Sequence, residues 1–272
     1  MAIEEGQLDS GFYYFNRVSE ILAGVQDQSQ SEWSDLYARF YNKLGVLYGK
    51  KGESDISQRY FHQALSIVEE NNWSNTIAAD VLMNVGINHD FSGRYDSANS
   101  FYQRALVLFK QLNRPDKQVS IYHNLGAMFT DAEQTDSALR YLNLANQIIV
   151  EHGGMKYEQG FNSIKRGLVY LIKGEFEQSV RLLEQSLQEV RGEFPYLEGE
   201  ALELLKESYA GSGNYKRAYE VSLRYDSLVT VQQQQETEQI AREIEGKYQS
   251  ELKAKEIALL KHQNTRQGKT LD

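Results

Sequence analysis

The chain has 272 residues, among them 20 glycines but only two prolines and no cysteine. Without cysteine it has no disulfide scaffold, no thiol nucleophile and no cysteine zinc ligand. Acidic residues outnumber basic ones by 38 to 29, and the net charge of −9 argues against non-specific binding to nucleic acid or anionic membranes. No apolar run is long enough for a membrane-spanning helix. The scarcity of proline favours long helices.

A repeat with a period near 40 residues organises most of the chain. Its anchor positions follow one another at intervals of 41, 40, 41 and 39 residues, at Gly45, Gly86, Gly126, Gly167 and Lys206. A small residue in mid-helix predicts the close approach of a second helix. Seven positions later stands a residue that we expect to end this first helix in the left-handed conformation. These turn residues are Gly52, Gly93, Glu133, Gly174 and Gly213.

In each unit the second helix follows the turn and carries small and large residues on one stripe, as Ser57, Phe61 and Ala64 do in the first copy. This pattern resembles the tetratricopeptide repeat, whose unit is an antiparallel helix pair. The resemblance implies an all-α superhelical solenoid that binds a protein or peptide and catalyses no reaction. We expect five helix pairs, over residues 36–71, 77–112, 117–152, 158–192 and 197–229.

The first residues match the second half of a repeat. The run GQLDSGFYYFNRVSEIL from Gly6 aligns with GRYDSANSFYQRALVLF from Gly93, so Gly6 takes the turn position and Gly11 the small position. We therefore predict a half repeat over residues 5–27, which extends the solenoid to 5–229. The match favours a piece of a longer repeat array, and the alternative is an N-terminal capping helix that shares the pattern.

The composition changes at Tyr225, after which Glu, Gln, Lys and Ala predominate and Gly246 is the one helix breaker before Asn264. This predicts one long polar helix over residues 230–265 and a disordered tail over 266–272. Its apolar residues run at four-residue steps before the pattern shifts, as in an interrupted coiled coil. The helix is either a dimerising, signalling element or a solvated one. The residues expected at the dimer contact are Ile240, Ile244, Tyr248, Leu252, Ile257 and Leu260.

The run EGKYQSELKAKEIALLKHQN from Glu245 is similar to the segment that follows the repeats in bacterial tetratricopeptide-repeat sensors, especially membrane histidine kinases and LuxR-type regulators. That resemblance implies the periplasmic sensor region of a signal-transduction protein, with a membrane helix expected beyond Asp272. The alternative is a self-contained cytosolic regulator or assembly scaffold that responds to a peptide.

No phosphate loop, metal-binding helix or nucleophile motif occurs, so we expect no catalytic residue, cofactor or metal. His89 stands where other repeats carry Tyr or Phe, which predicts packing between helices. The family resemblance implies a concave groove lined by the first helices, with Asn84 and Asn124 either contacting a peptide backbone or pairing with neighbours. The expected groove residues are Arg39, Asn42, Asp80, Met83, Asn84, Ile87, Asp90, His123, Asn124, Thr130, Phe161, Ile164 and Leu168.

The charges and apolar groups of this groove narrow the expected ligand. A carboxylate clamp for acidic peptide ends needs several basic side chains, and few stand near these positions. The apolar end at Phe161, Ile164 and Leu168 suits a peptide with hydrophobic anchors, whether extended or helical.

Overall fold

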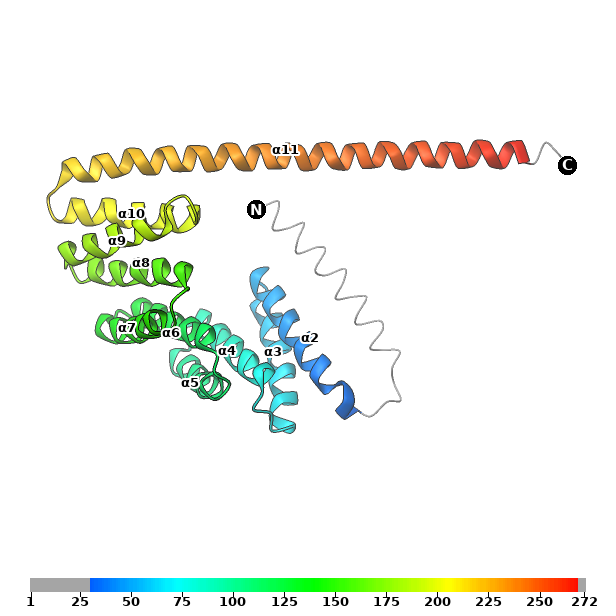
Figure 1. Cartoon of the computed structure of the whole chain (residues 1–272). Helices are drawn as coiled ribbons and strands as arrows, with labels where there is room; N and C mark the ends of the chain where they lie inside the picture. The colour runs from blue at the N-terminus through cyan, green and yellow to red at the C-terminus, as the bar shows by residue number, and fades with distance from the viewer. Residues whose placement is uncertain (1–29, 269–272) are drawn as a thin grey trace. The chain divides into compact units, whose positions relative to one another are not determined.

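The computed structural model describes residues 30–268, and over these residues the chain forms ten helices and no strand (Figure 1). The predicted half repeat of residues 5–27 lies outside the described residues. The chain divides into two compact units, and the boundary lies between Ser222 and Leu223. The helices are α2 (Gln30–Lys50), α3 (Ser54–Glu70), α4 (Thr76–Phe91), α5 (Tyr95–Gln111), α6 (Pro115–Asp131), α7 (Thr135–His152), α8 (Lys156–Ile172), α9 (Phe176–Val190), α10 (Pro195–Gly211) and α11 (Tyr215–Gly268).

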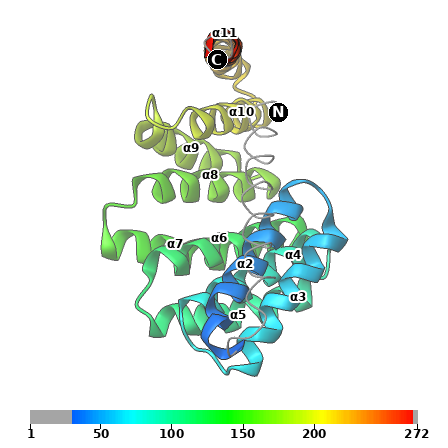
Figure 2. The same cartoon turned by 90° about the vertical axis from the view of Figure 1, so that its right-hand side faces the viewer.

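The first unit is a stack of helix pairs. Helix α2 packs on α3, α4 on α5, α6 on α7 and α8 on α9, and the second helix of each pair contacts the first helix of the next. The first helices α2, α4, α6, α8 and α10 also contact one another in order, so they share one side of the stack (Figure 2). The predicted all-α solenoid with a long C-terminal helix is confirmed.

The anchor glycines lie where two helices of one pair approach most closely. A methyl group at Gly86 would lie 2.8 Å from the Tyr102 ring, and one at Gly126 would lie 2.7 Å from the Leu142 side chain. Gly45 and Gly167 meet the second helix of their own pairs in the same way. Since no side chain fits these gaps without a shift, glycine is required there. The predicted role is confirmed for these four glycines, whereas Lys206, the fifth anchor, carries a half-buried side chain.

The turn residues also adopt the predicted left-handed backbone. Gly52, Gly93, Gly174 and Gly213 have φ between 69° and 81°, and Glu133, which replaces glycine in the third copy, has φ of 57°. At these turns the backbone amides of the two residues after the helix donate to carbonyls of its last turn, which satisfies groups that the helix itself leaves unpaired. The five first helices therefore end in the same way although the third lacks the glycine.

His89 packs between the helices of its pair, as predicted. Its ring stacks on Phe101 of α5 with the ring centroids 5.3 Å apart. The Arg94 guanidinium donates a hydrogen bond of 2.9 Å to His89 Nδ1. Burial, together with the charges of Arg94 and His62, lowers the pKa of His89, so the imidazole is neutral at physiological pH. It acts as a packing aromatic group.

Helix α11 differs from its predicted bounds. It begins at Tyr215, inside the last predicted repeat, and continues to Gly268, past the predicted end at residue 265. The physical reason is the absence of a breaker: no glycine or proline occurs between Tyr215 and Gly246, so nothing separates the second helix of the fifth pair from the polar stretch that follows. In the first turns of α11, Ala218 and Val221 are buried in the first unit.

Candidate binding face

We call one side of the stack the first-helix face; it is formed by α2, α4, α6, α8 and α10. The predicted groove residues lie on these helices. Most of them are half-buried, so each packs on its neighbours while leaving part of its side chain accessible. Arg39 is exposed, whereas Asn42 and His123 are buried. The half-buried residues are Asp80, Met83, Asn84, Ile87, Asp90, Asn124, Thr130, Phe161 and Leu168.

The prediction was wrong for Ile164, which is fully buried. On α8, the accessible stripe consists of Phe161, Lys165 and Leu168, at the spacing of four and three that one helix face requires. Ile164 lies at the inner edge of this stripe and belongs to the core. A ligand on this face therefore meets the Lys165 side chain where sequence reasoning placed Ile164.

Two predicted groove residues pair with each other. The Asn84 amide of α4 donates a hydrogen bond of 3.0 Å to the Asn42 side-chain oxygen of α2. This bond joins the first helices of two successive repeats, and Asn42 is only 7% exposed. Of the two predicted alternatives for Asn84, pairing with a neighbour is therefore present in the structure. A contact of Asn84 or Asn124 with a peptide backbone stays a prediction.

Charged groups link the next helices. The Lys117 ammonium of α6 lies 3.1 Å from the Asp80 carboxylate of α4. Near the end of α4, Asp90 accepts a hydrogen bond of 3.3 Å from the Tyr102 hydroxyl. Burial raises the pKa of Asp90, whereas the Tyr102 bond lowers it and the nearby Asp131 raises it. Burial and the Asp90 carboxylate both raise the pKa of Tyr102. These acidic groups are therefore engaged by the protein itself.

His123 lies at the contact between α6 and α8. Its ring is 4.9 Å from the Phe161 ring, centroid to centroid. Burial is the main cause that lowers the pKa of His123 to about 4; the adjacent Asn162 side chain raises this pKa, and the Lys165 charge lowers it. Neither His123 Nε2 nor the amide of the fully buried Asn162 has a hydrogen bond of good geometry. This contact therefore places a neutral imidazole beside a buried amide.

The far end of the face is acidic, which sequence reasoning missed. The Lys165 ammonium lies 4.8 Å from the Phe161 ring centroid and 2.5 Å from the Glu200 carboxylate of α10. On the same helix, Glu203 and Glu207 are exposed. The signal was available, since the offsets that select groove residues in the first four repeats select these three glutamates in the fifth.

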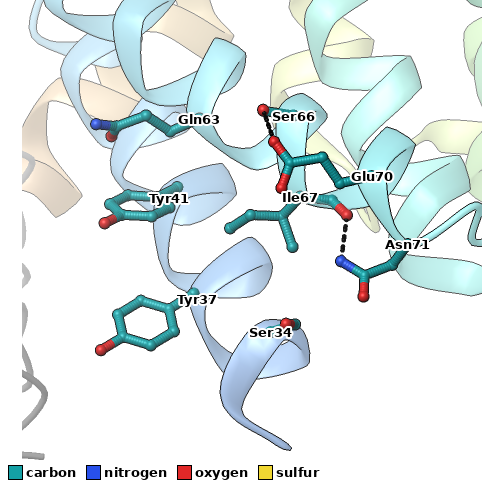
Figure 3. A pocket seen from close by; sticks show the side chains of 8 residues that line it. All are labelled: Ser34, Tyr37, Tyr41, Gln63, Ser66, Ile67, Glu70 and Asn71. Atoms are coloured by element: carbon teal, nitrogen blue, oxygen red, sulfur yellow. Dashed lines mark hydrogen bonds between the residues drawn. The ribbon is translucent and has the colours of Figure 1, made fainter. Parts of the chain in front are cut away.

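A cavity of about 610 Å³ lies between α2 and α3, away from the predicted residues (Figure 3). Tyr41 of α2 and Ile67 of α3 approach it from its two sides. Its polar groups are largely bonded: the Ser66 hydroxyl donates to Glu70 at 2.6 Å, and the Asn71 amide donates to the Ile67 carbonyl at 2.7 Å. The cavity lies in the first described helix pair, at the end of the stack.

The side chains predicted for a dimer contact are largely exposed on α11. The exposed fractions are 63% for Ile244, 59% for Tyr248, 42% for Leu252 and 53% for Ile257, and Ile240 is half-buried. The side chain of Leu260 lies outside the described residues. The structure thus leaves this apolar stripe available, and a dimer through it stays a prediction.

Within residues 30–268, no three side chains of the metal-ligating types His, Cys, Asp or Glu converge on one point. Among the helices described, none has both the length and the apolar character needed to cross a membrane.

Residues 36–111 match the family described as tetratricopeptide repeat. Among curated proteins, the chain is similar to the regulatory protein RapK of Bacillus subtilis (strain 168), with 24% identity over 151 residues. The match covers 51% of this chain and 41% of RapK, so the chain spans about two fifths of the length of that relative.

Several solved structures share the fold. BtubC (BKLC) from P. vanneervenii superimposes with a TM-score of 0.68 at 17% identity, covering 84% of this chain and 92% of that one. The putative kinesin light chain of Podosopora anserina gives 0.63 at 15% identity, covering 74% and 98%. Aspartyl phosphate phosphatase F from Bacillus subtilis gives 0.62 at 17% identity, covering 82% and 67%. At these identities the likeness concerns the fold alone, and that fold is the tetratricopeptide-repeat solenoid.

Proposed function

We propose that this tetratricopeptide-repeat chain is a non-catalytic module that binds a peptide, or a segment of a protein partner, on its first-helix face. The observation that carries the proposal is the row of half-buried apolar side chains across this face, namely Met83 and Ile87 on α4 and Phe161 and Leu168 on α8. Apolar groups that stay partly accessible beside polar ones are typical of surfaces that bind a partner.

The amides beside this row suit a peptide backbone. Asn84 and Asn124 are half-buried on the same face, and a side-chain amide both donates and accepts hydrogen bonds.

The charges on the face favour one orientation of the ligand. Glu203 and Glu207 are exposed on α10, whereas Lys117 and Lys165 are already held by Asp80 and Glu200. The exposed charge at the α10 end is therefore negative. We expect a ligand with a basic group near α10 and hydrophobic anchors near Phe161 and Ile87, because opposite charges set the orientation of binding partners.

Selection from a random peptide library displayed on phage, followed by calorimetry with a selected synthetic peptide, tests this function. Phe161→Ala should weaken the binding of that peptide at least tenfold, because it removes an apolar anchor. Phe91→Ala is the matched control, since Phe91 is 91% exposed at the end of α4. Failure to select any peptide, or equal losses in the two variants, would contradict the proposal.

The names of RapK and phosphatase F describe a regulator and a phosphatase. Within residues 30–268, no observation supports catalysis. We propose two alternative cellular settings for the binding module. As the sensor region of a bacterial signal-transduction protein it would be periplasmic, and as a self-contained regulator or scaffold it would be cytoplasmic.

Continuity of α11 favours the sensor setting. This helix belongs to the last repeat at Tyr215 and continues without a break to Gly268, so a change in that repeat is passed along one hydrogen-bonded element. Hydrogen exchange of the α11 amides with and without the selected peptide separates the settings. Changed protection beyond Leu223 supports a sensor, and protection unchanged there supports the self-contained regulator.

A further inference from the structure

The second half of α11 exposes apolar side chains along one stripe. Ile240, Ile244, Tyr248 and Leu252 follow one another at four-residue steps, and the last three are each at least 42% exposed. A helix with 3.6 residues per turn keeps such positions within one broad face. Exposed apolar groups grouped on one helix face are typical of a surface that another helix covers.

The charged residues around this stripe are arranged symmetrically about Gln249. Each charged residue from position 242 to position 256 has a residue of opposite charge at the same distance on the other side of Gln249. All eight side chains are exposed. The four pairs are Lys247 with Glu251, Glu245 with Lys253, Glu243 with Lys255, and Arg242 with Glu256.

Such an inverted pattern is what an antiparallel pair of identical helices requires. When two copies run in opposite directions about a two-fold axis at Gln249, each residue lies level with its counterpart on the other side of that position. Lys247 of one copy is then level with Glu251 of the other, and the same holds in reverse. All four pairs are level twice in such a dimer, and the position of each residue around the helix decides which of them meet.

The edges of the apolar stripe agree with this arrangement. By helical periodicity, Lys247 and Glu251 lie along one edge of the stripe, and Arg242 and Glu256 lie towards the other. In an antiparallel pair each edge faces the same edge of the partner helix. Lys247 and Glu251 therefore lie on the side where they can meet, whereas Glu243 and Lys253 point away from the stripe.

A parallel pair of the same helices is disfavoured by these charges. In parallel coiled coils the flanking residues that face each other are five positions apart. That offset would place Arg242 against Lys247. Like charges at such positions oppose association.

Two of these charged residues already have partners within the helix. Glu243 accepts a hydrogen bond of 3.2 Å from the Gln239 amide. Arg242 forms an ion pair with Glu238 one turn away at 3.1 Å, with both side chains at least 68% exposed. Exposed pairs of this kind contribute little to stability, so Arg242 exchanges partners at small cost.

We propose that the second half of α11 pairs with a second copy of this chain as an antiparallel two-helix interface, with its two-fold axis at Gln249. The proposal does not depend on ligand binding at the first-helix face, because it uses only residues 240–258. A loss of peptide binding therefore leaves it untouched, and a monomeric chain leaves the proposed function untouched.

Spin labels distinguish the two directions of pairing. Because the chain has no cysteine, Gln249→Cys and Thr237→Cys each give one labelling site in the full chain. Labels at position 249 should be close together in the dimer. Labels at position 237 should be about 36 Å apart, since 24 residues of helix at 1.5 Å each separate the two copies of this position. A short distance at both positions would show a parallel pair, and no dipolar coupling at either would show a monomer; either result overturns the proposal.

Charge exchange tests the complementarity itself. Lys247→Glu places a carboxylate level with the Glu251 carboxylate of the other copy, twice in the dimer, and should weaken dimerisation on the order of tenfold in sedimentation equilibrium. The double variant Lys247→Glu with Glu251→Lys should restore the wild-type constant to within about twofold, because it reverses each pair without breaking it. Lys110→Glu, an exposed site on α5, is the control for net charge. A double variant as weak as the single one would overturn the proposal.

Discussion

Helices α5 and α11 have the same backbone geometry and opposite surroundings. In α5, Ala98, Tyr102, Ala105, Leu106 and Phe109 are all buried, and they pack against neighbouring helices. In α11 beyond Leu223, the side chains are mostly exposed, and a methyl group at Gly246 would meet nothing within 4 Å. The solenoid helices depend on tertiary packing, whereas the second half of α11 depends on helix propensity and local charge pairs.

The largest difference between these regions should appear at two tyrosines. Tyr102 is fully buried against Gly86, whereas Tyr248 is 59% exposed. Tyr102→Ala should lower the free energy of unfolding by about 3–5 kcal/mol, because it leaves a cavity in the core and removes the hydroxyl bond to Asp90. Tyr248→Ala should change the free energy of unfolding of the solenoid by less than about 0.5 kcal/mol, because Tyr248 belongs to the separate second unit. Urea unfolding followed by circular dichroism checks both, and equal losses would contradict the contrast.

The next effect is a loss of stability at low pH, which we expect in the solenoid because His123 is buried there. Burial lowers the pKa of His123 to about 4, below the value near 6.5 of an unfolded histidine. Between these values the unfolded chain binds a proton that the folded chain does not, so stability falls as the pH falls from 6.5 to 4. The loss should be on the order of 3 kcal/mol by pH 4.

Replacing the histidine isolates that contribution from the carboxylates that titrate in the same range. His123→Asn should reduce the slope of stability against pH, measured by urea unfolding from pH 7 to pH 4. His152→Gln, at an exposed histidine on α7, is the control and should keep the wild-type slope. An unchanged slope in His123→Asn would show that burial at the α6–α8 contact does not control the proton.

The smallest predicted effect comes from replacing a glycine with alanine, which should destabilise the solenoid and stabilise α11. Gly86→Ala places a methyl group 2.8 Å from the Tyr102 ring and should destabilise the solenoid by about 1–3 kcal/mol despite the better helix propensity of alanine. Gly246→Ala meets open space and should stabilise α11 locally by up to about 1 kcal/mol. Thermal unfolding and amide exchange measure the two effects. Loss of stability in both variants would contradict the view that the glycines have different roles.

Predictions from the sequence were correct where a physical requirement restricts the residue type at a single position. A close helix approach excludes every side chain at Gly86 and Gly126, and a left-handed turn selects glycine at Gly93, so both requirements are visible as a period. Predictions from the sequence were less accurate where the rotation of a helix about its axis decides which side chain is accessible. Ile164 and Lys165 are neighbours in sequence, and a small difference in the rotation of α8 decides which of them is accessible.

The candidate site was predicted in outline and missed in detail. The first helices were expected to carry it, and most of the predicted residues are half-buried there. The cavity between α2 and α3 was not predicted, because its walls come from separate helices with no common motif. The acidic end at Glu203 and Glu207 was missed because the predicted groove stopped at the fourth repeat, although Lys206 marks the anchor of the fifth.

The helical class, the repeat period and the glycines at contacts and turns could be predicted from the order of residues, since each depends on backbone geometry or close packing within one repeat. The charge pattern about Gln249 is likewise visible in that order. The folded structure was needed to show that Asn84 bonds to Asn42, that Ile164 is buried, and that burial lowers the pKa of His123. These properties depend on side chains brought together from different helices, and no local pattern in the sequence specifies that contact.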